Sequence, residues 1–204
     1  MPEEQRLAYP VPDLLYAYGY KVFSSNEKMA NHELLSNLIA NKLGVILPFF
    51  TVECKSQLPT PGSLWVAENQ AAGSSATCVK LMEHLNEHVK QHAGDIAINN
   101  LDTSVFSVVT NGNEARLSVT WKSVDGAYLM KEVRGYLLSQ ENQYIQFRRA
   151  VRNILDWGMN ERLEGIRLRL RTLRHEQETG GKRRRVSDAS PDSEQTQVKR
   201  TRRE

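Results

Sequence analysis

The stretch "PFFTVECKSQ", residues 48–57, ends an apolar run with a glutamate and a lysine. Side chains alternate across a strand, so Glu53 and Lys55 share one face while Cys54 points to the other. Charges on a buried strand ordinarily need a partner or an ion. The run from about Val45 to Lys55 therefore predicts a buried strand, with Glu53 and Lys55 at its end as candidate catalytic residues. A surface ion pair of small energetic value is the alternative.

The segments on either side of this strand predict regular structure. Residues 9–20, "YPVPDLLYAYGY", favour an extended entry and a short aromatic strand, because proline pushes the preceding residue out of helical geometry. Residues 30–42 carry leucines at helical spacing, with Gly44 as a stop. After the loop "SQLPTPGS", a helix is expected to begin near Ser74 or Ser75. Its buried stripe is Cys78, Met82, Leu85 and Val89.

The second half of the chain predicts a hairpin followed by helices. Residues 103–110 and 114–122 alternate apolar and polar side chains around an "NGNE" turn. Residues 128–138 suit a strand, although their pattern also tolerates a helix. Two helices are expected at 141–156 and 160–175, separated around Trp157 and Gly158. An apolar stripe should dock the second of them: Leu163, Ile166, Leu170 and Leu173.

Composition divides the chain into a domain and a tail. Residues 180–204 hold eight Lys or Arg and four Asp or Glu, which leaves 19 basic against 20 acidic residues elsewhere. The tail has too few apolar residues to bury a core and is expected to be disordered. We therefore predict one α/β (α+β) domain over residues 1–179, with a central mixed β-sheet flanked by helices, and a basic tail over 180–204.

The tail contains two basic clusters separated by "VSDASPDSEQTQV", the pattern of a bipartite nuclear localisation signal. A generic polyanion-binding arm is the alternative. The signal predicts a nuclear protein that engages a nuclear import receptor. Two cysteines and the lack of an apolar leader favour a reducing compartment, and the absence of a long apolar run predicts no membrane association. The cluster residues are Lys182, Arg183, Arg184, Arg185, Lys199, Arg200, Arg202 and Arg203.

A second acid stands before the first predicted strand. Asp13 ends "VPD", and if the strands that follow Asp13 and contain Glu53 are neighbours, the two carboxylates form a pair with Lys55 beside them. Mg²⁺ takes oxygen ligands and keeps several waters, so one or two carboxylates plus substrate phosphate oxygens hold it. Such an ion stabilises charge on a phosphate, and a lysine positions the attacking water. A turn-forming aspartate after proline is the alternative for Asp13.

These residues resemble the motif of the PD-(D/E)XK nuclease superfamily, which has the restriction-endonuclease-like fold. Pro12-Asp13 and Glu53-Cys54-Lys55 carry the resemblance, with weaker support from Gln70 in "WVAENQAAG". Within that superfamily, residues 9–175 resemble a fungal branch of domains of unknown function, through blocks such as "PFFTVECKS", "LWVAENQAAGS" and "NILDWG".

The resemblance implies a role for each matching residue. Asp13, Glu53 and the backbone carbonyl of Cys54 would hold Mg²⁺ or Mn²⁺, Lys55 would be the catalytic lysine, and Gln70 an auxiliary site residue. The implied activity is hydrolysis of nucleic acid, with DNA favoured over RNA. The alternative is a catalytically inactive nuclear domain of the same fold that binds nucleic acid or protein.

Other charged residues favour simpler interpretations. His84, His88 and His92 recur at helical spacing but lack a Cys or acid at zinc spacing, so a solvated face is expected. A nucleophilic role for Cys54 has no identifiable general base. Two groups of arginines would form solvated or ion-paired faces, or contact phosphates without reading sequence. They are Arg148, Arg149, Arg152, Arg167, Arg171 and Arg174.

Overall fold

The computed structural model describes residues 11–56, 63–93 and 101–187, and the side chains of residues 11–56, 64–92 and 101–179. Five strands form one mixed sheet in the order β1-β2-β3-β4-β5. Strands β2 and β3 are parallel, and the other neighbours are antiparallel. The strands are β1 Leu14–Tyr18, β2 Ile46–Cys54, β3 Val105–Thr110, β4 Glu114–Lys122 and β5 Tyr128–Leu137. The predicted mixed sheet is therefore confirmed.

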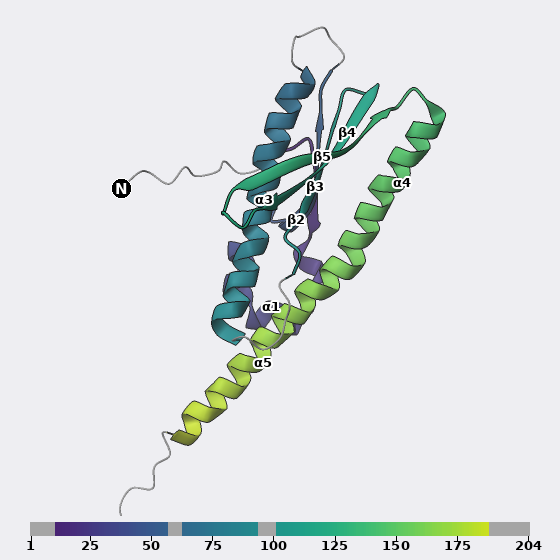
Figure 1. Cartoon of the computed structure of the whole chain (residues 1–204). Coiled ribbons are helices and arrows are strands. Elements are labelled where there is room, and N and C mark those ends of the chain that lie inside the picture. Colours follow the sequence, from purple (N-terminus) through teal and green to yellow (C-terminus); the bar gives the residue numbers. More distant parts are fainter. Residues whose placement is uncertain (1–10, 57–62, 94–100, 188–204) are drawn as a thin grey trace, which may run out of the picture.

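Helices cover both faces of this sheet (Figure 1). Helix α3, Ser63–Ala93, packs on β2, β3 and β4, and its buried side carries the predicted stripe from Cys78 to Val89. Helix α4, Glu141–Trp157, lies across the other face, where Phe147 and Val151 adjoin the core around Phe50. Strand β2 is apolar along most of its length because both of its faces are covered.

Helix α3 begins eleven residues before the predicted start at Ser74. Ser74 and Ser75 lie inside the helix, where Ser75 Oγ donates to the Ala71 carbonyl oxygen at 2.6 Å and lies 2.8 Å from Thr120 Oγ1 of β4. A serine can occupy an internal position of a helix when its hydroxyl has such partners. The prediction of a capping serine was therefore wrong.

The predicted helix over 30–42 is instead two short helices, α1 Ser25–Ala30 and α2 His32–Asn37. Ser24 starts α1 through a capping box with Glu27. Asn31 leaves helical geometry between the two helices, with φ −124° and ψ 27°. Ile39 then forms a β-bridge to Ile46 instead of continuing a helix. A short 3₁₀ turn, η1 Tyr20–Val22, precedes α1.

The two predicted C-terminal helices are parts of one continuous helical rod (Figure 1). A π-helical segment, η2 Gly158–Arg162, joins α4 to α5, Leu163–Ser187, and Gly158 keeps α-helical dihedrals of φ −61° and ψ −42°. The prediction of a break at Trp157 and Gly158 was wrong. The stripe predicted on the last helix is confirmed, because Leu163, Ile166, Leu170 and Leu173 are all buried.

The π-helical segment turns Arg162 into the interior. Only 1% of Arg162 is exposed, and its guanidinium lies over the Trp157 ring, 5.2 Å from the ring centroid. Nη1 donates to the carbonyl oxygens of Asp102 and Ser104 at 3.0 and 3.3 Å. This arginine therefore ties the segment before β3 to the middle of the rod, a role that helical periodicity alone did not indicate.

Helix α5 continues to Ser187, past the predicted domain boundary at residue 179. Lysine and arginine are good helix formers, and extending an existing helix adds one hydrogen bond per residue. The first basic cluster, residues 182–185, falls in this helical backbone. The second cluster, residues 199–203, lies outside the described residues. None of the described helices is long and apolar enough to cross a membrane.

Candidate metal and catalytic site

The two predicted carboxylates meet at the edge of the sheet. Strand β1 is antiparallel to β2 with Leu14 opposite Val52, which places Asp13 opposite Glu53. The Cys54 backbone N–H donates to Asp13 Oδ2 at 2.6 Å, and the Asp13 backbone hydrogen-bonds the Glu53 carboxylate. Each carboxylate is therefore held by the backbone of the opposite strand, across 40 positions of sequence.

Glu53 is an acid in an unfavourable environment. Glu53 is only 3% exposed. Burial raises the pKa of the Glu53 carboxyl above its ordinary value, and the negative charge of Asp13 raises it further. The ammonium of Lys55 and a hydrogen bond from Ser74 oppose these effects. A buried acid beside a second acid is an environment that a cation would stabilise.

Lys55 lies one residue beyond β2 and is half-exposed. Its backbone N–H donates to the Thr110 carbonyl oxygen at 2.8 Å, which fixes this end of the chain against β3. Alternation along the strand puts its ammonium on the side of Glu53, in agreement with its electrostatic effect on that carboxyl. The predicted grouping of Asp13, Glu53 and Lys55 is therefore present in the folded chain.

Ser74 completes this group, although the sequence indicated it only as a candidate helix cap. It is buried on α3 and hydrogen-bonds the Glu53 carboxylate across the gap between helix and sheet. Gln70 lies one helical turn earlier on α3 and is exposed. Its auxiliary role stays a prediction. A serine four residues after Gln70, on the face that covers the sheet, was the signal available in the sequence.

An ion pair network anchors the beginning of α3 beside this site. Arg116 Nη1 lies 2.7 Å from Glu68 Oε1 of α3, and Arg116 Nε lies 2.8 Å from Glu114 Oε1. Arg116 pairs with Val109, which in turn pairs with Glu53. The network therefore holds the N-terminal part of α3 at the strands next to Glu53.

The donor set for a metal is small. Within residues 11–56, 63–93 and 101–187, no group of three or more His, Cys, Asp or Glu side chains is placed to hold a metal ion. Two carboxylates and the Cys54 carbonyl nevertheless suit Mg²⁺, which keeps most of its coordination as water. The repulsion between Asp13 and Glu53 is the feature that such an ion would relieve.

Cys54 offers no support for nucleophilic chemistry. Cys54 is exposed overall. The pKa of its thiol is nevertheless raised, first by partial desolvation and then by the negative charges of Asp13 and Glu53. A raised pKa lowers the fraction of reactive thiolate. The structure is consistent with a contribution from the Cys54 backbone alone.

The three histidines lie along α3 away from the site. His84 and His92 are exposed, as predicted for a solvated face. The rings of His88 and His92 stack with centroids 4.1 Å apart. Burial lowers the pKa of His88, and the neighbouring histidines lower it further, so this face disfavours added positive charge.

The arginines of the rod differ between its two halves. Arg167 pairs with Glu164 at 2.6 Å and Arg174 with Glu178 at 2.9 Å, which is the ion-paired arrangement expected for α5. Arg148, Arg149 and Arg152 of α4 are exposed, and in the described part of the chain no ion pair joins them to a carboxylate.

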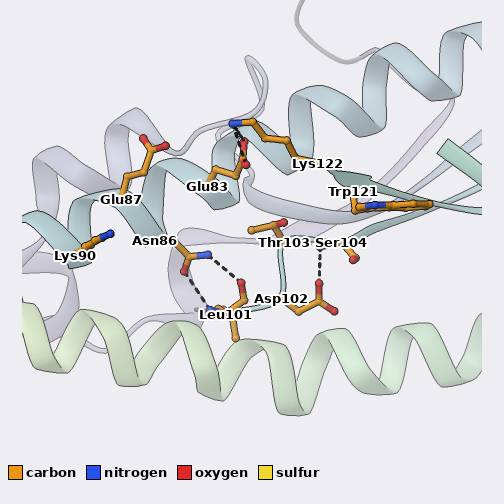
Figure 2. Close-up of a pocket in the computed structure, with 10 residues that line it drawn as sticks. All are labelled: Glu83, Asn86, Glu87, Lys90, Leu101, Asp102, Thr103, Ser104, Trp121 and Lys122. Atoms are coloured by element: carbon orange, nitrogen blue, oxygen red, sulfur yellow. Dashed lines mark hydrogen bonds and ion pairs between the residues drawn. The ribbon is translucent and has the colours of Figure 1, made fainter. Parts of the chain in front are cut away.

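A polar hollow of about 610 Å³ lies toward the other end of α3 (Figure 2). Lys122 pairs with Glu83 at 3.2 Å, and the Asn86 side chain bonds both the N–H and the carbonyl of Leu101. Asp102 accepts the Ser104 N–H at 2.8 Å. These polar groups bond to one another. We therefore interpret the residues around the hollow as structural, since they hold the segment that leads into β3.

Comparison with known proteins identifies a family for most of the chain. Residues 3–170 match the family model described as Domain of unknown function (DUF7924). The curated proteins and the solved structures give no match. The matched range contains the whole sheet, Asp13, Glu53, Lys55 and the rod as far as Leu170. The chain therefore belongs to the DUF7924 family.

Proposed function

We propose that this chain is a nuclease-fold protein of the PD-(D/E)XK type that hydrolyses phosphodiester bonds of nucleic acid with Mg²⁺ or Mn²⁺. The observation that carries the proposal is the meeting of Asp13 and Glu53 at one sheet edge, with Lys55 beside them. The family match assigns no activity, so the proposal rests on this arrangement and on the resemblance of the motif.

Each residue has a defined task in the proposed reaction. Asp13 and Glu53 would hold the cation, with Ser74 keeping the Glu53 carboxylate oriented. A bound Mg²⁺ would neutralise charge on the phosphate and lower the pKa of a coordinated water. Lys55 would position the attacking water or stabilise the charge that develops on the phosphate oxygens. The exposed side of Asp13 leaves the site open to a nucleic acid backbone.

Plasmid nicking tests this proposal directly. The full chain is expected to nick supercoiled plasmid with Mg²⁺ or Mn²⁺ but not with EDTA, and Lys55→Ala should lower the rate about a hundredfold. Lys55 is half-exposed, so this variant should fold normally. Lys131→Ala, which removes an exposed lysine of β5 at the sheet edge opposite β1, serves as the control. Equal rates for the wild type and Lys55→Ala would reject the assignment.

A second candidate is a domain of the same fold that binds nucleic acid or protein without turnover. The small number of candidate metal ligands favours it, since in the described part of the chain no group of three or more His, Cys, Asp or Glu side chains is placed to hold a metal ion. Thermal denaturation with and without Mn²⁺ separates the two candidates. Stabilisation by the ion without nicking would indicate an inactive binding domain, whereas stabilisation with nicking would indicate the enzyme.

We also propose that the two basic clusters direct the chain to the nucleus through an import receptor. The motivating observation is the charge of residues 182–185 and 199–203. Replacing the eight basic residues with glutamine, in a fusion too large for passive diffusion, is expected to abolish nuclear accumulation. Glutamine retains helix propensity, so the α5 backbone should persist. Unchanged accumulation would contradict the signal.

A further inference from the structure

An apolar groove lies between the sheet and α4, on the face opposite Glu53. Its volume is about 460 Å³. Val52 and Glu53 are adjacent on β2 and point to opposite faces, so the groove and the candidate metal site are separate. The apolar walls come from Tyr16, Val52 and Val108 of the sheet and from Phe147, Val151 and Leu155 of α4.

The apolar surface continues beyond the groove itself. Tyr16 is 37% exposed although its ring stacks on Phe50 with centroids 5.3 Å apart. Leu14, which precedes it on the same face of β1, is 51% exposed. On α4, Tyr144 is 44% exposed, one turn before Arg148. An apolar hollow that opens onto exposed apolar side chains is typical of an interaction site.

The rim of the groove on α4 is positively charged. Arg148 and Arg152 stand one helical turn apart, both line the groove, and both are exposed. The Arg148 guanidinium lies over the Tyr144 ring, 5.8 Å from its centroid. Asp156 is the acid among the lining residues, and in the described residues no ion pair joins it to either arginine. The rim therefore keeps a net positive charge.

We propose that this groove binds an acidic amphipathic segment of a partner protein. Apolar side chains of the segment would fill the hollow, and its carboxylates would pair with Arg148 and Arg152. An amphipathic segment seated in an apolar groove, with charges matched at the rim, is a recurrent mode of peptide recognition. The inference is independent of nuclease activity, because the residues concerned lie on the other face of the sheet.

The residues in and beside the groove favour a peptide over a nucleic acid strand as its ligand. Single-stranded nucleic acid binds where aromatic rings offer open faces for base stacking. Here the Tyr16 ring stacks on Phe50, and a guanidinium occupies a face of Tyr144. The aliphatic part of the lining suits leucine-like side chains, and it consists of Val52, Val108, Val151 and Leu155. The arginines then confer a preference for acidic segments.

Selection from a random peptide library on the immobilised full-length protein tests the proposal. Enriched peptides are expected to combine apolar residues with Asp or Glu. Their affinity, measured by fluorescence anisotropy, should fall about tenfold in Arg152→Glu, through loss of one charge pair and gain of a repulsion. Val151→Thr, a near-isosteric change in the wall, should also weaken binding. Enrichment of peptides without acidic residues, or no enrichment, would overturn the proposal.

Arg149→Glu is the matched control for Arg152→Glu. It changes the same charge on an exposed arginine of the same helix, and Arg149 does not line the groove. Its peptide affinity should stay within about twofold of the wild type, because exposed charges outside a contact contribute little. Equal losses of peptide affinity in both variants would show that only the net charge of the protein matters, and would overturn the proposal.

Two further measurements exclude other occupants. If Arg152→Glu weakened binding of a fluorescent single-stranded oligonucleotide while leaving the selected peptides unaffected, the rim would serve nucleic acid. If light scattering showed a dimer that Val151→Thr dissociates, the groove would be an interface between copies of the chain. Either result would overturn the peptide assignment. Loss of peptide binding in a monomer with unchanged oligonucleotide affinity would support it.

Discussion

Replacing Glu53 with glutamine is expected to lower the proposed metal-dependent hydrolysis about a thousandfold. Glutamine keeps the shape of the side chain and the hydrogen bond with Ser74, but it removes the charge that would hold a cation beside Asp13. Nicking rates with Mg²⁺ or Mn²⁺ measure the loss. Activity equal to that of the wild type would remove Glu53 from the site.

The same change is expected to stabilise the metal-free protein. The carboxylate of Glu53 is buried next to Asp13, so its charged form is disfavoured in the folded state. A folded-state pKa above the ordinary value of 4.5 means that stability is lost as pH rises through that folded pKa. Glu53→Gln should therefore raise the free energy of unfolding by about 1 to 2 kcal/mol near neutral pH, and the gain should vanish below the ordinary pKa.

Urea denaturation in EDTA, at about pH 4 and about pH 7.5, measures this gain. Asp13→Asn is the matched variant, because it also removes a candidate ligand but changes an exposed carboxylate. It should abolish hydrolysis without the gain in stability, since it weakens the bond from the Cys54 N–H. A Glu53→Gln protein less stable than the wild type would show that the hydrogen bonds of the carboxylate outweigh the effect of its burial.

Replacing Gly158 with alanine is expected to destabilise the protein by about 3 kcal/mol. In an isolated helix this change would add about 1 kcal/mol of stability, and the helical dihedrals of Gly158 permit it. A Cβ atom at this position would however lie 2.1 Å from Cε2 and 2.4 Å from Cζ of Phe49. The clash decides the sign, because neither the ring nor the helix has room to move.

The surroundings of Phe49 explain why it cannot yield. The residue is 1% exposed, and its ring packs between Tyr18 and Trp157, with centroids at 5.4 and 6.3 Å. The Tyr18 hydroxyl donates to the Gly158 carbonyl oxygen at 2.6 Å, which ties the rod to β1. Moving the helix outward would lengthen this bond and open the core around the ring.

Chemical denaturation of Gly158→Ala and Gly73→Ala gives a matched comparison. Gly73 lies within α3, and a Cβ there would meet nothing within 4 Å, so Gly73→Ala should stabilise by about 1 kcal/mol. The double variant Gly158→Ala with Phe49→Leu should recover part of the loss if the clash is the cause. A Gly158→Ala protein as stable as the wild type would contradict the packing argument.

Local patterns in the sequence determined much of the fold. The apolar run of β2, the alternation and turn of β3 and β4, and the stripes of α3 and α5 each lie within one element, where side-chain period follows backbone geometry. The same patterns were insufficient at element boundaries. Ser74 resembles a cap until α3 is seen to extend back to Ser63, and Gly158 resembles a stop until it is seen to face Phe49.

The candidate site shows the same division. That Glu53 and Lys55 share a face follows from the sequence, because side chains two positions apart on one strand point to the same side. Three other features needed the folded chain: Asp13 lies opposite Glu53, Ser74 hydrogen-bonds the same carboxylate, and Arg148 and Arg152 border an apolar groove. Strand registry and helix packing bring together residues that are far apart in sequence. Packing of the whole core stabilises that registry, so no local pattern indicates it.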